Sequence, residues 1–98
     1  MNMNLKISSL AKADIDEAVE YYNLQKSGLG NDFKKELIRS FKLIKSFPKS
    51  YRLVSKRLRM HIMQKFPYRI FYNLRNEDII VVSVFHFKRD WDWDYDLK

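Results

Sequence analysis

The chain has 98 residues, of which 46% are hydrophobic and 15% aromatic, which suffices for one hydrophobic core and excludes global disorder. It contains no cysteine, which excludes disulfide bonds and cysteine-ligated metal sites. The formal net charge of +7 is concentrated in residues 34–75, where Glu36 is the only acidic side chain, and such a region attracts nucleic acid or an acidic protein.

The first elements are a short strand and a helix. Residues 4–8 alternate apolar and polar side chains, which predicts a strand. Ser9 is placed to cap a helix over residues 10–25, because its hydroxyl can accept from a free backbone N–H of the first turn. The apolar side chains of this helix recur on one face: Ala11, Ile15, Ala18, Val19 and Tyr22.

A second helix follows a link that contains Gly28 and Gly30. Asn31 is placed to cap it, the spacing predicts residues 32–46, and Pro48 prevents its continuation. Its apolar stripe consists of Phe33, Leu37, Phe41 and Ile44. Two helices with so short a link should pack as an antiparallel hairpin.

The second half alternates with a period of two and predicts strands over residues 57–65, 68–74 and 79–87. In the first of these, Leu58, Met60 and Ile62 share one face, and the opposite face, away from the helices, should carry Arg57, Arg59 and His61. In the next, Tyr68, Ile70 and Tyr72 share a face that we expect in the core. The last strand is the most apolar and should be central.

This order of elements predicts an α+β fold: a strand, an antiparallel helical hairpin, then three or more antiparallel strands that form a twisted sheet. We expect a single domain over residues 1–98. The longest apolar stretch, residues 79–87, is too short to span a membrane, and residues 1–6 lack the apolar block of a secretory signal. The expected location is therefore the cytoplasm, with no membrane association.

The candidate binding residues are mainly cationic. There is no glycine-rich phosphate loop, no metal-spaced cluster and no Ser-His-Asp arrangement, so we expect neither a cofactor nor a metal. Cations neutralise phosphates and aromatic rings stack on bases, a combination that suits single-stranded RNA or a nucleic-acid-processing enzyme. The alternative is a solvated basic rim around the core. The candidates are Arg57, Arg59, Lys65, Arg69, Lys88, Arg89 and Trp91.

Several short motifs occur in a fixed order along the chain. They are Ala-Lys-Ala-Asp-Ile at 11–15, Tyr-Tyr at 21–22, Gly-Asn-Asp-Phe at 30–33, Phe-Pro at 47–48, Phe-Pro-Tyr-Arg-Ile-Phe-Tyr at 66–72, and Val-Phe-His-Phe-Lys-Arg-Asp at 84–90. In this order and spacing the chain resembles the RelE/ParE toxin superfamily over about residues 7–93. The family fold, a helical hairpin against an antiparallel sheet, agrees with the elements predicted above.

The resemblance implies a type II toxin–antitoxin module, in which a cognate antitoxin protein wraps around the toxin and holds it inactive. RelE-like members cleave mRNA in the ribosome, whereas ParE-like members inhibit DNA gyrase by binding. The motif at 84–90 is closer to the ParE type. We therefore expect a gyrase inhibitor, with a RelE-like mRNA endonuclease or a non-toxic interaction module as alternatives. The sequence leaves open whether the toxin forms a homodimer.

An endonuclease without a metal needs a base, an acid and cations that stabilise the phosphorane charge. Arg57, Arg59 and Arg69 could supply the cations in this chain. Proton carriers could be His86, His61 or Tyr95, and His86 is the best placed because it lies close to Lys88 and Arg89. If the chain is a nuclease, its catalytic residues are therefore His86, Arg69, Arg59 and Arg57. The alternating acidic and aromatic residues at 90–96 have no assigned role.

Overall fold

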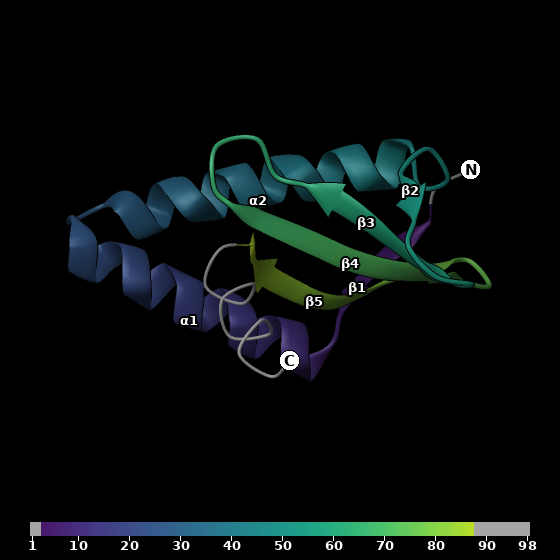
Figure 1. The fold of residues 1–98 in the computed structure, drawn as a ribbon, viewed down its shortest axis with the longest axis horizontal. Helices are drawn as coiled ribbons and strands as arrows, with labels where there is room; N and C mark the ends of the chain where they lie inside the picture. The colour runs from purple at the N-terminus through teal and green to yellow at the C-terminus, as the bar shows by residue number, and fades with distance from the viewer. Residues whose placement is uncertain (1–2, 88–98) are drawn as a thin grey trace, which may run out of the picture.

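A computed structural model describes residues 3–87 of the chain. Within this range, two helices follow the first strand and the remaining strands come after them (Figure 1). The elements are β1 (Asn4–Ile7), α1 (Ser9–Gln25), α2 (Leu29–Ser46), β2 (Arg52–Leu53), β3 (Leu58–Ile62), β4 (Tyr68–Arg75) and β5 (Asp78–His86). The predicted α+β fold is confirmed.

The strands form one sheet in the order β1-β5-β4-β3-β2. β1 pairs parallel to β5, and every other neighbouring pair is antiparallel. The first strand of the chain therefore lies beside the last one, so that β5 is flanked by β1 and β4. The two helices meet at one end of the molecule and diverge towards the other (Figure 1).

Helix α1 begins one residue earlier than the sequence predicted, and its N-cap is Ser8 and not Ser9. The backbone N–H of Ser8 donates to the carbonyl of Val81 at 3.0 Å, which continues the β1–β5 ladder and holds Ser8 extended. From this position its hydroxyl oxygen accepts from the N–H of Ala11 at 3.0 Å. The end of the strand thus selects which serine caps the helix.

Helix α2 begins at Leu29, so the predicted cap at Asn31 is wrong. Gly28 adopts a left-handed conformation with φ of 88°, and its carbonyl accepts from the N–H groups of Asn31 and Asp32. Gly30 is needed for a different reason. A Cβ atom there would lie 2.6 Å from the side chain of Asn23, whose carbonyl oxygen accepts from the Gly30 N–H at 2.8 Å. The close contact between Gly30 and Asn23 of α1 therefore lets α2 begin at Leu29, within the link that the sequence predicted.

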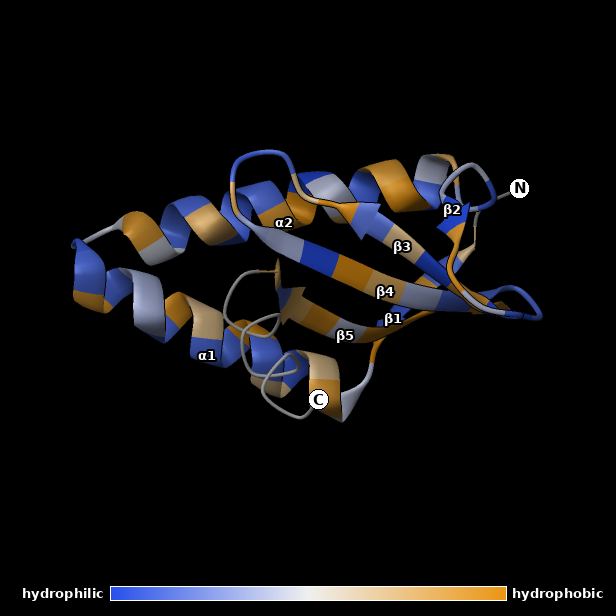
Figure 2. Ribbon diagram, in the orientation of Figure 1, coloured by the Kyte–Doolittle hydropathy of each residue, from blue (hydrophilic) through white to orange (hydrophobic). Residues whose placement is uncertain are grey.

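The core lies between the helical hairpin and one face of the sheet. Apolar and polar residues alternate along both helices, and β5 is mostly apolar (Figure 2). Near the hairpin turn, Tyr22 and Phe33 pack on Phe66 and Tyr68, with ring centroids 4.9–6.1 Å apart. The core face of β4 is confirmed, because Tyr68, Ile70 and Tyr72 are all buried. Such aromatic pairs each contribute about 0.5–1.5 kcal/mol beyond their buried area.

Strand β3 turns the opposite face inward from the one that the sequence predicted. His61 pairs with Ile70 and is 3% exposed, and Arg59 pairs with Tyr72, so both lie on the helix-facing side. Ile62 is 56% exposed on the other side, and β3 ends there, short of the predicted residue 65. The polar face is inward because the connection between α2 and β2 covers it, and backbone carbonyls of this connection accept hydrogen bonds from Arg59.

That connection is fixed by side chains of β3 and β4, which form a polar corner of the core. The Arg59 guanidinium donates to the carbonyls of Tyr51 at 2.8 Å and Lys49 at 3.1 Å, and the Tyr72 hydroxyl donates to the carbonyl of Pro48 at 2.8 Å. Burial raises the pKa of Tyr72 to about 12, against the opposing charge of Arg59. The ring of His61 contacts the ring of Tyr51 edge to face at 4.6 Å.

The edge of β5 is completed by helix α1. Pairing with β1 stops at Val81, but β5 continues to His86, which would leave backbone groups without a strand neighbour. The Asp14 carboxylate of α1 accepts there from the N–H of Val84 at 3.0 Å and from the hydroxyl of Ser83 at 3.1 Å. The Ser8 hydroxyl also donates to the carbonyl of Val82 at 3.0 Å, so side chains replace the missing strand along this part of the edge.

Replacing Asp14 with Ala should lower the free energy of unfolding by about 1–3 kcal/mol, because the Val84 N–H loses its charged acceptor. Urea denaturation of the two proteins measures this. Asp16→Ala is the matched control, because Asp16 is exposed and makes only a long ion pair, 3.9 Å from Lys12. Its free energy of unfolding should stay within about 0.5 kcal/mol of the wild type. Equal losses in the two variants would contradict the capping role of Asp14.

The stability of the fold should also depend on the titration of His61. Neither ring nitrogen has a hydrogen-bond partner among residues 3–87, and burial lowers the pKa of His61 from its ordinary value of 6.5. The pKa is thus higher in the unfolded chain, so the stability contributed by neutral His61 is present above about pH 6.5 and is lost as the pH falls. His61→Phe should therefore lose less stability than the wild type between about pH 7.5 and about pH 5. Urea midpoints that fall in parallel would contradict this role.

Candidate functional site

The sheet has one face that the helices do not cover, which we call the open face. Cross-strand register places Met60 beside Phe71 and Arg69 between Ile62 and Phe85. The exposed fractions of Ile62, Phe85 and Phe87 are 56%, 40% and 41%, large values for side chains of this kind. The open face thus carries Met60, Ile62, Arg69, Phe71, Phe85 and Phe87.

Arg69 lies in the middle of these apolar side chains. Its guanidinium carbon is 4.1 Å from the centroid of the Phe87 ring, a cation–π contact, and Phe71 contacts Phe85 edge to face at 6.0 Å. A groove of about 440 Å³ at this end of the sheet is lined by the loop between β3 and β4 together with Ile62, Arg69 and Phe87. Lys65 belongs to this loop, so the structure brings two of the candidate cations, Lys65 and Arg69, to one groove.

Of the other predicted cations, the structure describes Arg59 and Arg57, and both lie away from this groove. Arg59 is on the helix-facing side, where its guanidinium is bonded to the carbonyls of the polar corner. Arg57 is exposed in the bend that precedes β3. Lys88, Arg89 and Trp91, as well as Tyr95, lie outside the described residues. The expectation that Arg57, Arg59 and His61 share the face away from the helices is therefore wrong for Arg59 and His61.

His86 lies on the opposite side of the sheet from Arg69. It pairs with Tyr68, is 8% exposed, and contacts the Tyr68 ring edge to face at 4.9 Å. A hollow of about 200 Å³ between α1 and β5 borders His86, Asp14 and Glu17. Residues 3–87 thus do not bring His86, Arg69, Arg59 and Arg57 into one centre, as a general acid or base acting with phosphate-binding cations would require.

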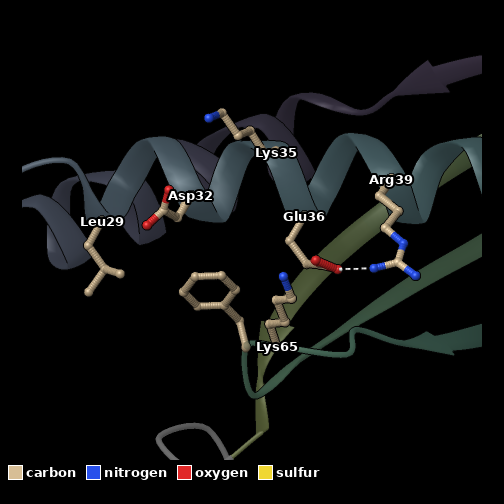
Figure 3. A pocket seen from close by; sticks show the side chains of 7 residues that line it. Leu29, Asp32, Lys35, Glu36, Arg39 and Lys65 are labelled. Atoms are coloured by element: carbon tan, nitrogen blue, oxygen red, sulfur yellow. Dashed lines mark ion pairs between the residues drawn. The ribbon is translucent and has the colours of Figure 1, made fainter.

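A third hollow, of about 490 Å³, separates α2 from the loop between β3 and β4 (Figure 3). Its cations are Lys35 and Arg39 of α2 and Lys65 of the loop. Glu36 also borders it, although this side chain is only 5% exposed. One carboxylate oxygen, Oε2, lies 3.6 Å from Nη1 of Arg39 and has no hydrogen-bond partner in the described part of the chain.

Glu36 is the residue of this region that sequence reasoning missed. The sequence analysis identified Glu36 only as the sole carboxylate of the basic residues 34–75. A signal was present, however, because Glu36 lies three residues after Phe33 and directly before Leu37, within the apolar stripe of the helix. Its burial places a negative charge beside Arg39 and restricts where that guanidinium can lie.

Residues 3–87 contain no group of three or more His, Asp or Glu side chains that could hold a metal ion. No helix in the same range is long and apolar enough to cross a membrane.

Comparisons with known proteins agree with this architecture. Residues 5–91 match the family model described as ParE toxin of the type II toxin–antitoxin system parDE. A solved structure described as the chromosomal ParDE TA system from P. aeruginosa superposes with a TM-score of 0.78 at 14% identity, covering 88% of this chain and 97% of that one. A mutant of the E. coli toxin RelE in the free state superposes with a TM-score of 0.52 at 15% identity, covering 96% of this chain and 93% of that one.

A search of functionally curated proteins found no match. At their low identities, the two solved structures establish the fold, and the family model adds the assignment, since it spans most of the chain from β1 to beyond β5. The chain therefore belongs to the ParE toxin family of type II toxin–antitoxin systems.

Proposed function

We propose that this toxin inhibits DNA gyrase by binding it through the open face, and that a cognate antitoxin keeps the toxin inactive in the cytoplasm. The observation that carries the proposal is the position of His86 and Arg69 on opposite sides of the sheet. An endonuclease needs its proton carrier and its phosphate-binding cations around one reacting phosphate. A protein that acts by binding has no such requirement.

The open face has the composition of a protein-binding surface. Aromatic side chains, Met and Arg are enriched in protein–protein interfaces, and here Phe85 and Phe87 lie beside Arg69. Apolar area removed from water contributes roughly 25 cal/mol per Å², so exposed Phe and Ile side chains supply affinity. The positive charge of Arg69 and Lys65 adds a preference for acidic partners.

An antitoxin partner is supported by the family match and by the ParDE structure. The chemistry of this chain suggests that such a partner carries acidic and apolar residues. It would meet a net charge of +7 and a sheet face with exposed apolar side chains.

Substitution on the open face should weaken gyrase inhibition. Phe85→Ala removes a 40% exposed ring without disturbing the core, so we expect the concentration of toxin needed to inhibit supercoiling to rise at least about tenfold. Leu24→Ala is the matched control, because Leu24 is an 81% exposed apolar side chain of α1, and it should leave inhibition unchanged. Equal inhibition by the two variants would contradict the proposal that the open face binds gyrase.

A substitution at His86 distinguishes gyrase inhibition from the RelE-like alternative. His86→Gln should leave inhibition of supercoiling largely intact, whereas a nuclease that uses His86 as general acid or base would lose roughly 10²–10⁴-fold in rate. The assays are supercoiling by purified gyrase and cleavage of mRNA on programmed ribosomes, with urea denaturation to verify that the variant is folded. Cleaved mRNA with unaffected supercoiling would overturn the proposal, and harmless induction in growing cells would favour the non-toxic interaction module.

A further inference from the structure

A second surface, chemically different from the open face, runs along α2. The helix turns Phe33, Leu37, Ser40 and Ile44 inward. Its cations are all exposed on the remaining surface, and we call them the α2 ridge: Lys34, Lys35, Arg39, Lys42 and Lys45. The outer side of α2 is therefore strongly basic along most of its length.

Few carboxylates lie near the ridge, and they gather at its N-terminal end. Asp16 and Glu20 of α1 border the same hollow as Lys34, and Asp32 borders the hollow of Lys35 and Arg39. Asp32 is exposed in the first turn, before the ridge begins, and Glu36 is buried beside Arg39. Among residues 3–87, Arg39 is the only ridge cation with a carboxylate within ion-pair distance. Helix α1 differs in this respect, because its Lys12 lies 3.9 Å from Asp16 and several further carboxylates accompany it. The excess of exposed cations is thus a property of α2 and not of α1.

The hollow beside α2 adds another cation to the ridge. Lys65, on the loop between β3 and β4, lies across it from Arg39, whereas the side chain of Lys35 points away from Lys65 (Figure 3). Cations from two elements therefore border the same concave surface. The buried Glu36 carboxylate, 3.6 Å from the Arg39 guanidinium, restrains one of them.

The dimensions of the ridge fit a duplex nucleic acid. From Lys34 to Lys45 it spans about 16 Å at 1.5 Å per residue, and a duplex carries one negative charge per about 1.7 Å of its axis, so several phosphates lie within reach.

The composition of the ridge argues against a protein partner. Between Lys34 and Lys45, Ile38 is the one large apolar side chain that is exposed, at 53%. A peptide that orders on binding needs several apolar anchors to offset its lost conformational entropy, and these lie on the open face instead. A polyanion gains affinity from cations alone, through the release of counterions.

We propose that the α2 ridge, extended by Lys65, binds the phosphodiester backbone of a duplex nucleic acid without sequence specificity. Binding to the duplex and binding of a protein target then use different surfaces of the toxin, which share Lys65 at their common border. The proposal does not depend on gyrase inhibition, because duplex binding is measured without gyrase.

The test is fluorescence anisotropy of a labelled DNA duplex of roughly 20 base pairs, longer than the ridge, titrated with the full chain at several salt concentrations. Lys35→Glu/Lys42→Glu reverses two ridge cations. Lys12→Glu/Lys26→Glu is the matched control, because it changes the net charge equally on α1 and its C-cap. We expect the ridge variant to bind at least about tenfold more weakly and to lower the salt slope by roughly 2, with the control within about threefold of the wild type.

An RNA duplex of the same sequence distinguishes the two sources of phosphodiester backbone. Binding of either duplex that depends on the ridge supports the proposal, and the preferred one identifies the source. Equal losses in the two variants would overturn it, since net charge alone would then explain binding. No duplex binding by the wild type would overturn it as well, as would an acidic peptide whose binding depends on the ridge when duplex binding does not. Urea midpoints verify that both variants are folded.

Discussion

The parallel pairing of β1 with β5 is the constraint on which the arrangement of the two helices depends. Because β1 ends at Ile7, beside the middle of β5, the chain must enter α1 there and cross the unpaired part of the β5 edge. Ser8 serves both elements, since its backbone continues the ladder and its hydroxyl caps the helix. The Asp14 carboxylate then binds the edge that β1 leaves open, and this contact fixes α1 against β5.

A helical hairpin held in this way divides the surface of the molecule into two chemical regions. One side of the sheet is buried under the helices, so its other side is left with exposed apolar residues around Arg69. The outer side of α2 is left with exposed cations and few apolar groups. The division also places His86 in the region under the helices and Arg69 outside it, although both belong to adjacent strands.

Buried polar groups mark the places where the interior of this small domain is not purely apolar. At the corner between α2 and β2, Arg59 and Tyr72 satisfy carbonyls of the connection, whereas the imidazole of His61 packs on Tyr51 without a hydrogen bond in the described part of the chain. Glu36 is the second such group, beside Arg39. A polar group buried without a hydrogen bond costs free energy, which makes these two positions sensitive to substitution.

The sequence by itself determined six of the seven elements and their order, because helical and strand periodicity are local properties; it did not predict β2, whose two residues are too few to show a period. It also identified the apolar stripes of both helices, the inward face of β4 through Tyr68, Ile70 and Tyr72, and the superfamily through motifs of fixed spacing. Only the tertiary structure decided which face of β3 is buried. Alternation predicts that Arg59 and His61 share a face. This face is inward because of the register with β4 and because the connection between α2 and β2 covers both side chains. For the same reason, sequence distance did not reveal that His86 and Arg69 lie on opposite sides of the sheet, since a pairing between strands sets that relation.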